Sequence, residues 1–161
     1  MLTQEELKRI WNYDLETGLF TRLVATTFRT KVGQIASPIK EGRVVIRINK
    51  ILYQGCRLAF LYVNGKWPTQ EVDHINGLPS DNRWCNLRDV SHALNLQNLR
   101  NPRSDNASGY LGVHFDKQSK SWKAEIFSFG KRKRLGSFNS AQEASLAYIK
   151  NKRILHESCS I

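Results

Sequence analysis

Short stretches of periodic apolar residues, separated by polar turn signals, predict a chain of small helices and strands. Thr3 followed by Glu6 is a capping box, which predicts a short helix at the start of the chain. A turn signal between two apolar pairs predicts a hairpin over residues 12–22. β-branched residues with basic residues among them predict two strands within residues 43–53, with a turn near Asn49 and Lys50. An apolar helix is expected at residues 57–63.

The last third of the chain has a β-β-β-α order. Residues 101–108 are polar, contain a proline and show no apolar period, which indicates a linker. Strands are then expected at residues 110–115, 122–129 and 132–138. Ser140 and Glu143 form a second capping box that opens a helix with Ala144, Ala147, Tyr148 and Leu155 on one face.

These elements predict an α+β protein of two modules. A β-rich module is expected over residues 1–101, a linker over residues 102–108, and a three-stranded sheet with one helix over residues 109–161. A chain of 161 residues is long enough for two small modules, although each has a thin core.

Composition adds a first indication of the partner. The chain carries 25 Lys and Arg against 14 Asp and Glu, a formal charge of +11 with a pI near 9.9. Such a surplus is typical of proteins that bind a polyanion, most often nucleic acid. The alternative is a basic surface that serves only solubility. The start of the chain lacks the apolar core of a signal peptide, and no apolar run reaches membrane-spanning length, so a cytoplasmic protein without a membrane partner is expected.

The basic charge is uneven along the sequence. Residues 100–134 contain nine Lys or Arg against three acidic residues, a net of +6. Strand alternation places Trp122, Ala124 and Ile126 on the helix-facing side of the predicted sheet. The opposite face would carry the residues that we expect to contact DNA in the major groove: His114, Lys123, Glu125, Arg132 and Arg134. The alternative for the run at residues 131–134 is a solvated basic hairpin or a run that resembles a nuclear-import signal. Arg100 and Arg103 of the linker region are expected to add contacts to the DNA.

Residues 71–99 are rich in His and Asn at spacings that packing does not explain. Asp73 and His74 would end a strand, a loop would follow, and a second strand over residues 86–90 would return. A helix capped by Ser91 would come next. An Asp-His pair alone is more often structural than catalytic, but a strand hairpin followed by a helix can bring four polar side chains to one place: Asp73, His74, Asn86 and Asn95.

These residue types suit hydrolysis of a phosphodiester bond. The carboxylate of Asp73 and the amide oxygen of Asn95 are ligands that a hard divalent ion prefers. Such an ion can stabilise the departing 3′ oxygen as a Lewis acid. His74 titrates near neutral pH and can take a proton from the attacking water. An amide hydrogen bond from Asn86 would orient the imidazole, whereas Asn82 is expected only to hold the loop.

Four stretches carry a resemblance to a known family: RLAFLYVNGKWP at residues 57–68, VDHING at 72–77, DNR at 81–83 and NLR at 86–88. Over roughly residues 10–101 the chain resembles phage-type HNH endonucleases, which include the homing endonucleases of group I introns. The resemblance implies a ββα-metal core at about residues 71–101, with His74 as general base and Asn86 as the middle asparagine. It implies Asp73 and Asn95 as ligands of one divalent ion, magnesium or alternatively manganese.

The three cysteines need comment in this context. Cys56 stands where many relatives carry a histidine, and we expect it to pack rather than react. Together with Cys85 and Cys159 it is too widely spaced for a disulfide framework or a Cys-x-x-Cys zinc site.

The final module resembles the APETALA2 (ethylene-response-factor) DNA-binding domain in SGYLGV at residues 108–113, WKAEI at 122–126, LGSF at 135–138 and EASLAY at 143–148. That resemblance implies a three-stranded sheet on one helix. It assigns His114, Glu125, Arg132 and Arg134 to base- or phosphate-contacting positions. Leu111, Asp116 and Phe127 stand where plant relatives have arginines, so the base preference does not transfer.

The sequence therefore predicts a metal-dependent HNH endonuclease that cuts duplex DNA and is positioned by its C-terminal module. We expect a monomer on DNA, acting in the host cytoplasm if a phage encodes it. Two alternatives stay open at this point. One is a DNA-binding regulator that keeps the scaffold without turnover. The other is an accessory nuclease that acts beside a second phage protein, such as the packaging machinery.

Overall fold

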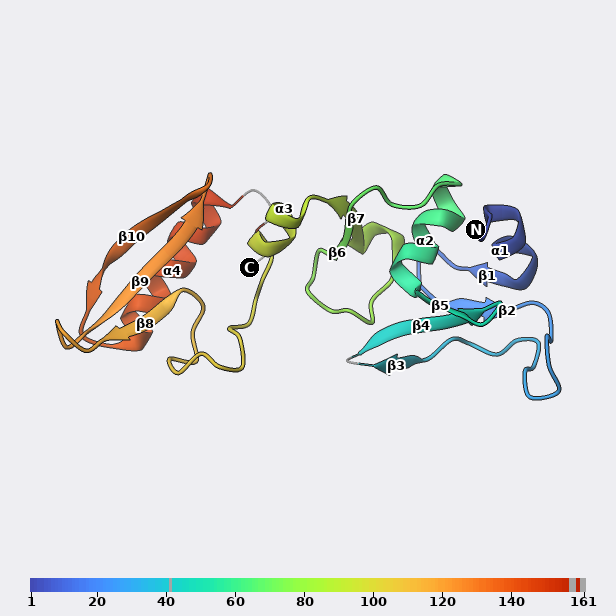
Figure 1. The fold of residues 1–161 in the computed structure, drawn as a ribbon, viewed down its shortest axis with the longest axis horizontal. Coiled ribbons are helices and arrows are strands. Elements are labelled where there is room, and N and C mark those ends of the chain that lie inside the picture. The colour runs from blue at the N-terminus through green and yellow to red at the C-terminus, as the bar shows by residue number, and fades with distance from the viewer. Residues whose placement is uncertain (41, 157–158, 160–161) are drawn as a thin grey trace. The chain divides into compact units, whose positions relative to one another are not determined.

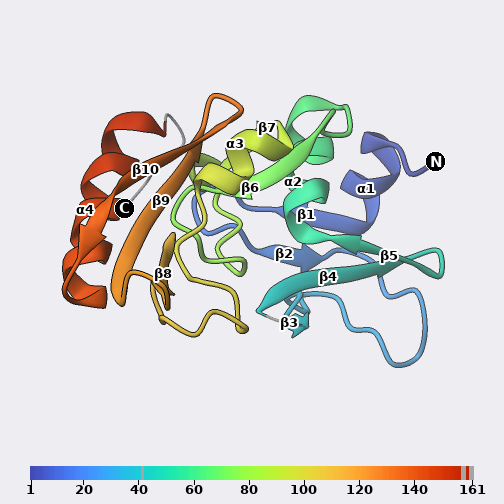
Figure 2. The same ribbon diagram turned by 60° about the vertical axis from the view of Figure 1, so that its left-hand side comes forward.

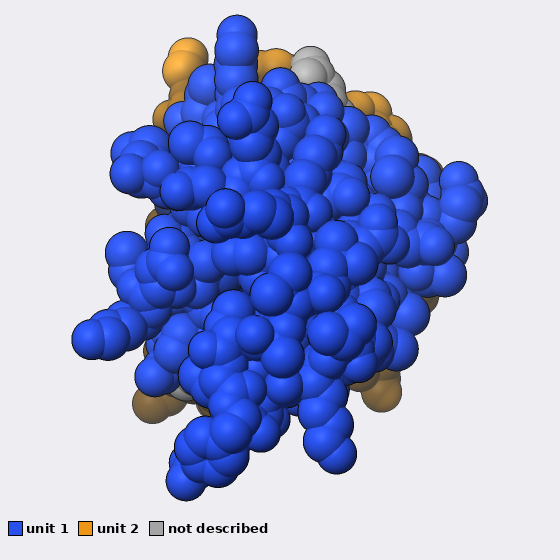
Figure 3. Space-filling view, turned by 90° about the vertical axis from the view of Figure 1, so that its right-hand side faces the viewer, with its two compact units in different colours: residues 1–92 blue, residues 93–161 orange. Residues whose placement is uncertain are grey.

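The chain folds as two compact units. The computed structural model describes residues 1–40, 42–156 and 159. The first unit comprises residues 1–92 and the second residues 93–161, shown in blue and orange in Figure 3. The sequence predicts the boundary at residue 101, whereas the structure places it inside helix α3 (His92–Gln97). The segment after α3 goes with the second unit because the buried Lys152 ammonium donates a hydrogen bond to the carbonyl of Leu99.

The first unit begins with the predicted helix and hairpin (Figure 1). Helix α1 (Gln4–Ile10) has the expected capping box, in which Thr3 and Glu6 satisfy each other's main-chain N–H groups. Strands β1 (Trp11–Tyr13) and β2 (Phe20–Arg22) pair antiparallel. The carboxylate of Asp14 accepts two main-chain N–H groups in the connecting turn, so a local side-chain contact fixes the hairpin.

A three-stranded antiparallel sheet follows, with strand order β3-β4-β5. Its members are β3 (Pro38–Lys40), β4 (Arg43–Ile48) and β5 (Ile51–Gln54). The turn at Asn49 and Lys50 is confirmed: both residues have positive φ, 49° and 68°, which suits a two-residue hairpin turn. Strand β3 was not expected from the sequence. Alternation along β4 buries Val44, Ile46 and Ile48 and leaves Arg43 and Arg47 exposed.

Helix α2 (Gly55–Asn64) lies against this sheet and α1 (Figure 2). It is longer than the predicted 57–63, and it ends at Gly65, whose φ of 70° makes it a left-handed C-cap. The core of the first unit gathers around α2. Its fully or nearly fully buried members include Leu7, Tyr13, Phe20, Ile46, Leu58, Ala59 and Leu61.

The segment that carries the predicted site follows α2. Strand β6 (Glu71–His74) pairs antiparallel with β7 (Leu87–Val90). A loop and the 3₁₀ helix η1 (Trp84–Asn86) connect the two strands. Asn86, expected to begin the second strand, thus lies in η1. The short helix α3 comes next, so the predicted β-β-α order is present in the chain.

The second unit has the predicted β-β-β-α order. Strands β8 (Val113–Asp116), β9 (Ser121–Ser128) and β10 (Lys131–Phe138) form an antiparallel sheet in the order β10-β9-β8. Helix α4 (Ala141–Leu155) packs on one face of this sheet (Figure 2). The Ser140 side chain caps α4 by accepting from the N–H of Glu143. The core comprises Val113, Ala124, Ile126, Ala144 and Tyr148.

The architecture is thus a mixture of small antiparallel sheets and helices, in agreement with the predicted α+β class. No helix among the described residues is both long and apolar enough to cross a bilayer.

Gly112 offers a test of the packing in the second unit. Its φ is 65°, and a Cβ added there would overlap the ring of Tyr148 and the main-chain oxygen of Glu125. We expect Gly112→Ala to lower the stability of this unit by about 3 kcal/mol, because strain and overlap add. Gly130→Ala is the matched control: its φ is similar, 73°, but the added Cβ meets nothing within 4 Å.

The control should cost about 1 kcal/mol, the strain of a left-handed residue alone. Hydrogen exchange of the β9 amides measures the second unit separately from the first. Equal losses of protection in the two variants would contradict the close packing of Gly112 against Tyr148.

Candidate functional site

The β6–β7 hairpin positions the two residues at the centre of the predicted site. Asp73 lies opposite Arg88 and His74 lies opposite Leu87. Both polar side chains are buried, with exposed fractions of 6% and 7%. Because buried polar groups need partners, their contacts within the first unit decide what each can do.

Asp73 forms a salt bridge across the hairpin. Its Oδ2 accepts hydrogen bonds from Nε of Arg88 at 2.8 Å and from Nη2 at 2.6 Å. Directly opposite residues of an antiparallel pair share a face, so the hairpin register itself brings the two side chains together. The guanidinium fork holds the carboxylate in one orientation.

His74 is held by Asn82. The imidazole Nε2 lies 3.1 Å from Oδ1 of Asn82, whose side chain is 2% exposed. The main-chain oxygen of Asn82 accepts a 2.6 Å hydrogen bond from the hydroxyl of Tyr13 on β1. The asparagine that was expected only to hold the loop therefore also orients the imidazole, and Tyr13 fixes its position.

The surroundings favour the neutral form of His74. Burial lowers the pKa of the imidazole below 6.5, and the hydrogen bond with Asn82 opposes this shift in part. The positive charge of Arg43 lowers this pKa further, whereas the charges of Asp73 and Asp81 raise it. A neutral imidazole at neutral pH is the form that can accept a proton.

Asn86 has a different place from the one expected. Its Nδ2 donates to Oδ1 of Asn76 at 3.0 Å and to the carbonyl of Asp81 at 2.8 Å. Its Oδ1 accepts from the N–H of Asn76 at 2.9 Å. Both amide hydrogens and the oxygen are thus engaged in the loop between β6 and β7. The expected pairing of Asn86 with the His74 imidazole is replaced by pairing with Asn82, because η1 turns Asn86 toward the loop.

An ion pair completes this loop. Arg83 binds Asp81 through Nε at 2.8 Å and Nη2 at 2.6 Å, and Nδ2 of Asn76 donates to the same carboxylate at 2.6 Å. The hydrogen bonds from Arg83 lower the pKa of Asp81 to about 2. The ion pair within residues 81–83 therefore stabilises the loop.

Asn95 lies in α3 and belongs to the second unit, so it is not among the side chains that the first unit brings together. Among the described residues, no group of three or more His, Cys, Asp or Glu side chains is placed to hold a metal ion. A carboxylate with amide oxygens is nevertheless a donor set that fits a hard divalent ion. Asp73, fixed by Arg88, offers such a carboxylate oxygen.

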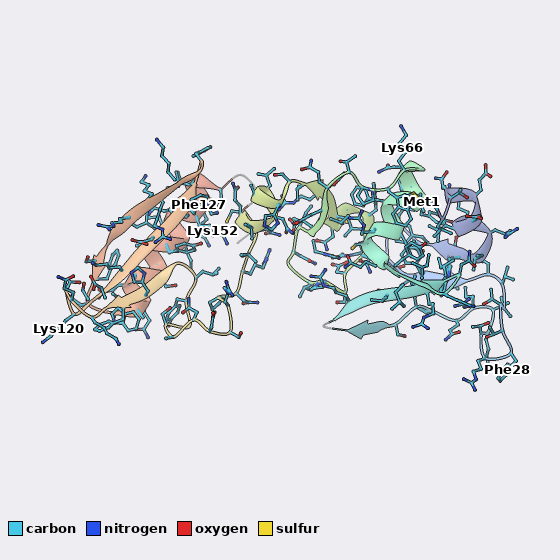
Figure 4. The ribbon with its side chains drawn as sticks, viewed as in Figure 1. Met1, Phe28, Lys66, Lys120, Phe127 and Lys152 are labelled. Atoms are coloured by element: carbon cyan, nitrogen blue, oxygen red, sulfur yellow. The ribbon has the colours of Figure 1, made fainter. Side chains whose placement is uncertain are left out.

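The second unit presents the predicted exposed face. The register pairs Arg134 with Glu125 and His114 with Lys123, so these side chains lie on the face opposite α4, together with Arg132. Phe127 also lies there, on β9, and is largely exposed (Figure 4). The predicted sorting of inward and outward residues on this sheet agrees with the burial of Ala124 and Ile126.

Contacts on this face give individual residues different roles. Nη1 of Arg132 and Nε of Arg134 lie 3.3 and 3.4 Å from the two carboxylate oxygens of Glu125. Glu125, expected to accept from a base, instead has both oxygens beside arginines. Lys123 forms an ion pair with Asp116 on the neighbouring strand, and this hydrogen bond lowers the pKa of Asp116. Arg132 and Arg134 remain the exposed cations of this face.

The two linker arginines are unlike each other. Arg103 is exposed, with its Nε 3.4 Å from Asp105. Arg100 is half-buried and lies near the buried ammonium of Lys152. The pKa of Lys152 is lowered mainly by burial, and the positive charge of Arg100 lowers it further.

Sequence reasoning missed the role of Arg88 and underestimated Asn82. The signal for Arg88 lies in the hairpin: once β6 and β7 are aligned, Arg88 is the residue opposite Asp73. The role of Asn82 requires a partner 69 positions away, Tyr13, and no local pattern encodes that contact.

Comparison with known proteins bears on the same segment. Residues 56–97 match a family model described as HNH endonuclease. The match covers α2, the β6–β7 hairpin and α3, and hence the four residues of the predicted centre. The chain is also 29% identical over 85 residues to Protein 3.8 of Escherichia phage T7, covering 53% of this chain and 69% of that protein. No solved structure matches the chain significantly. The matches support a nuclease of DNA and a relationship to phage proteins.

The pH dependence of stability tests the environment of His74. Because its folded pKa lies below the unfolded value of 6.5, the unfolded chain binds more protons as the pH falls. The stability due to neutral His74 is therefore fully present above pH 6.5 and is lost as the pH falls through the folded pKa. We expect His74→Gln to remove this loss from urea-unfolding free energies measured on both sides of pH 6.5. An unchanged pH slope in the variant would contradict the buried, neutral imidazole.

Proposed function

We propose that this protein is a metal-dependent HNH endonuclease that hydrolyses phosphodiester bonds of duplex DNA. The observation that carries the proposal is the buried Asp73–His74 pair at the end of β6, inside the segment that matches the HNH endonuclease family. Arg88 and Asn82 hold the two side chains in fixed orientations, as a preorganised reaction centre requires.

His74 is the general base in this proposal. The contact between Nε2 and the Asn82 amide fixes the ring, and a neutral imidazole has one basic nitrogen that can accept a proton. The lowered pKa keeps the ring neutral at physiological pH. His74 then takes a proton from the water that attacks the phosphorus, and the products are a 3′ hydroxyl and a 5′ phosphate.

Asp73 and Asn95 are the proposed ligands of one divalent ion, magnesium or manganese. When bound, such an ion supplies Lewis-acid stabilisation of the departing 3′ oxygen. Arg88 positions the Asp73 carboxylate through its two hydrogen bonds. Asn86 supports the reaction centre indirectly in this proposal, because its amide shapes the loop that carries Asn82.

The second unit is the proposed DNA reader. Its resemblance to the APETALA2 domain and its exposed, basic sheet face support this role. Arg132 and Arg134 are the proposed contacts with base edges or phosphates, with His114 beside them, and Glu125 aligns the two arginines. Lys123, Arg100 and Arg103 add positive charge. A monomer with one reaction centre is expected to nick one strand per binding event.

The variant His74→Ala tests the proposed base. It should reduce nicking of supercoiled plasmid in magnesium by about 10²- to 10⁴-fold, because proton transfer loses its acceptor. DNA binding measured by mobility shift should change little. The matched control is His92→Ala, which removes an exposed imidazole of the same segment that pairs with Glu71.

Normal nicking by His74→Ala would remove His74 from the mechanism. Wild-type protein that shifts the plasmid but nicks it in neither magnesium nor manganese would instead be a DNA-binding regulator. Cleavage that requires a second phage protein would identify an accessory nuclease.

The DNA face is tested by replacing both arginines with glutamine. Arg132→Gln with Arg134→Gln should weaken duplex binding and reduce the slope of log affinity against log salt by about 2, since each phosphate contact contributes about 0.9. If the arginines read bases instead, discrimination between duplex sequences should fall while the slope changes less.

The control changes the same number of charges on the same strand. Lys131 and Lys133 are exposed and pair with Ser128 and Ile126, on the opposite face of the sheet. Equal losses of affinity and slope in the Lys131→Gln, Lys133→Gln variant would show that net charge, and not this face, determines binding.

A further inference from the structure

A second basic region lies in the first unit, away from the proposed DNA reader. Between Arg22 and Arg57 the sequence contains eight Lys or Arg and one acidic residue, Glu41. The net charge of this segment, +7, exceeds the +6 of residues 100–134. Apart from Arg43, whose charge lowers the pKa of His74, these cations have no part in the proposed reaction. Arg22 lies on β2, and Arg29 and Lys31 lie in the loop after it. Arg43 and Arg47 lie on the exposed face of β4.

Arg22 on β2 is the most constrained of them. Its guanidinium carbon lies 4.4 Å from the centre of the Trp11 ring, on the paired strand β1. Its Nη1 is 3.5 Å from the hydroxyl of Thr26. Burial lowers the pKa of this guanidinium, a sign that it has lost part of its hydration.

Two donors at this place have no acceptor among the described residues. Nε of Arg22 and Nε1 of Trp11 are both shielded from solvent and make no hydrogen bond there. The Trp11 side chain is 3% exposed, so its N–H is one of the rare buried donors without a partner in the first unit. Such groups are costly unless an acceptor reaches them.

Two hollows flank Arg22. One, of about 250 Å³, is lined by Trp11, Gln34, Ser37 and Arg47 besides Arg22. The other, of about 370 Å³, is lined by Thr26, Thr30, Lys50 and again by Arg22 and Arg47. Neither lining contains a carboxylate, and no ion pair joins Arg22, Arg47 or Lys50 to another described residue. The charged side chains around both hollows are therefore all cations, namely Arg22, Arg47 and Lys50.

From this arrangement we propose that Arg22 and Arg47 form a binding site for a backbone phosphate of DNA, distinct from the reaction centre at His74. A phosphate supplies several acceptor oxygens for the guanidinium and indole N–H donors, and a negative charge that balances the two arginines. The tip of the loop after β2 lies outside the linings of both hollows. It carries Phe28, which is 90% exposed (Figure 4), with the guanidinium of Arg29 over its ring.

The inference rests on the proposed function for its ligand, DNA, but not on the catalytic roles of Asp73 and His74. Through this site the first unit would bind the phosphate backbone of the DNA substrate, whatever the DNA sequence. Phosphate contacts of this kind fix the position of a protein on the duplex, whereas base contacts specify the sequence.

The Trp11 indole provides a direct readout. In a ¹⁵N-labelled full-length protein, its N–H resonance is identified as the one that Trp11→Phe removes. Titration of the protein with inorganic phosphate should shift this resonance. Titration of the His74→Ala variant, which binds a short duplex without cutting it in this proposal, should shift the same resonance. Sodium chloride at matched ionic strength should not. The shift should be lost in Arg22→Gln.

Equilibrium DNA binding gives the second readout. Arg22→Gln and Arg47→Gln should each weaken binding about tenfold, equally for unrelated duplex sequences, and lower the salt slope by about 1. Arg47 is exposed, so its replacement leaves the core intact even if Arg22→Gln unfolds the unit. The matched control is Arg29→Gln, which removes the same charge from the same loop but lines neither hollow, and it should change binding less than about twofold.

Three outcomes overturn the inference. They are an unshifted Trp11 resonance in both titrations, a shift with inorganic phosphate but none with duplex, and equal effects of Arg47→Gln and Arg29→Gln. Because binding is measured without cleavage, these outcomes are distinct from failure of the proposed nuclease activity, which His74→Ala reports.

Discussion

The candidate site of the first unit depends on how the loop between β6 and β7 is anchored. Asn82, at the centre of that loop, is buried between the Tyr13 hydroxyl and the His74 imidazole. The N-terminal hairpin also contacts Asn82. Gly18 packs so closely on the main chain of Asn82 that a Cβ atom at position 18 would overlap it. Because the loop is held by residues far away in the sequence, the imidazole at its edge has one orientation rather than many.

The two central side chains show how adjacent residues acquire opposite electrostatic roles. Asp73 faces a guanidinium across the hairpin, and the salt bridge holds its carboxylate in one orientation. His74, the next residue, points to the other side of β6, where burial and a neutral amide favour the uncharged ring. Alternation along one strand thus separates a candidate metal ligand from a candidate base, and the cost of burying both is offset by specific partners.

The basic charge of the chain is organised by the same alternation. On β10, Arg132 and Arg134 share the face of Glu125, while Lys131 and Lys133 point the other way. On β4, Arg47 lies outward while Ile46 and Ile48 fill the core, so the cation reaches the hollows beside Arg22. A uniform positive field would attract DNA anywhere on the surface. Sorted in this way, the cations form two groups, one in each unit, and these are the groups that we propose as contacts with DNA.

Local patterns in the sequence determined most of the secondary structure and the choice of central residues. The Thr3–Glu6 capping box, the Asn49–Lys50 turn and the outward face of β9 and β10 depend on neighbours within a few positions or one strand pair, and each is found where expected. Of the second capping box only the Ser140 cap is present, because the Glu143 carboxylate accepts from the N–H of Asn139 instead. The sequence also singled out Asp73 and His74 by type and spacing. Only the tertiary structure decided their partners. Asn82 and not Asn86 meets the imidazole because η1 turns Asn86 into the loop, and Trp11 and Arg22 are joined with Arg47 because separate strands converge there. Contacts between residues distant in sequence follow from packing as a whole, which no short window of sequence encodes.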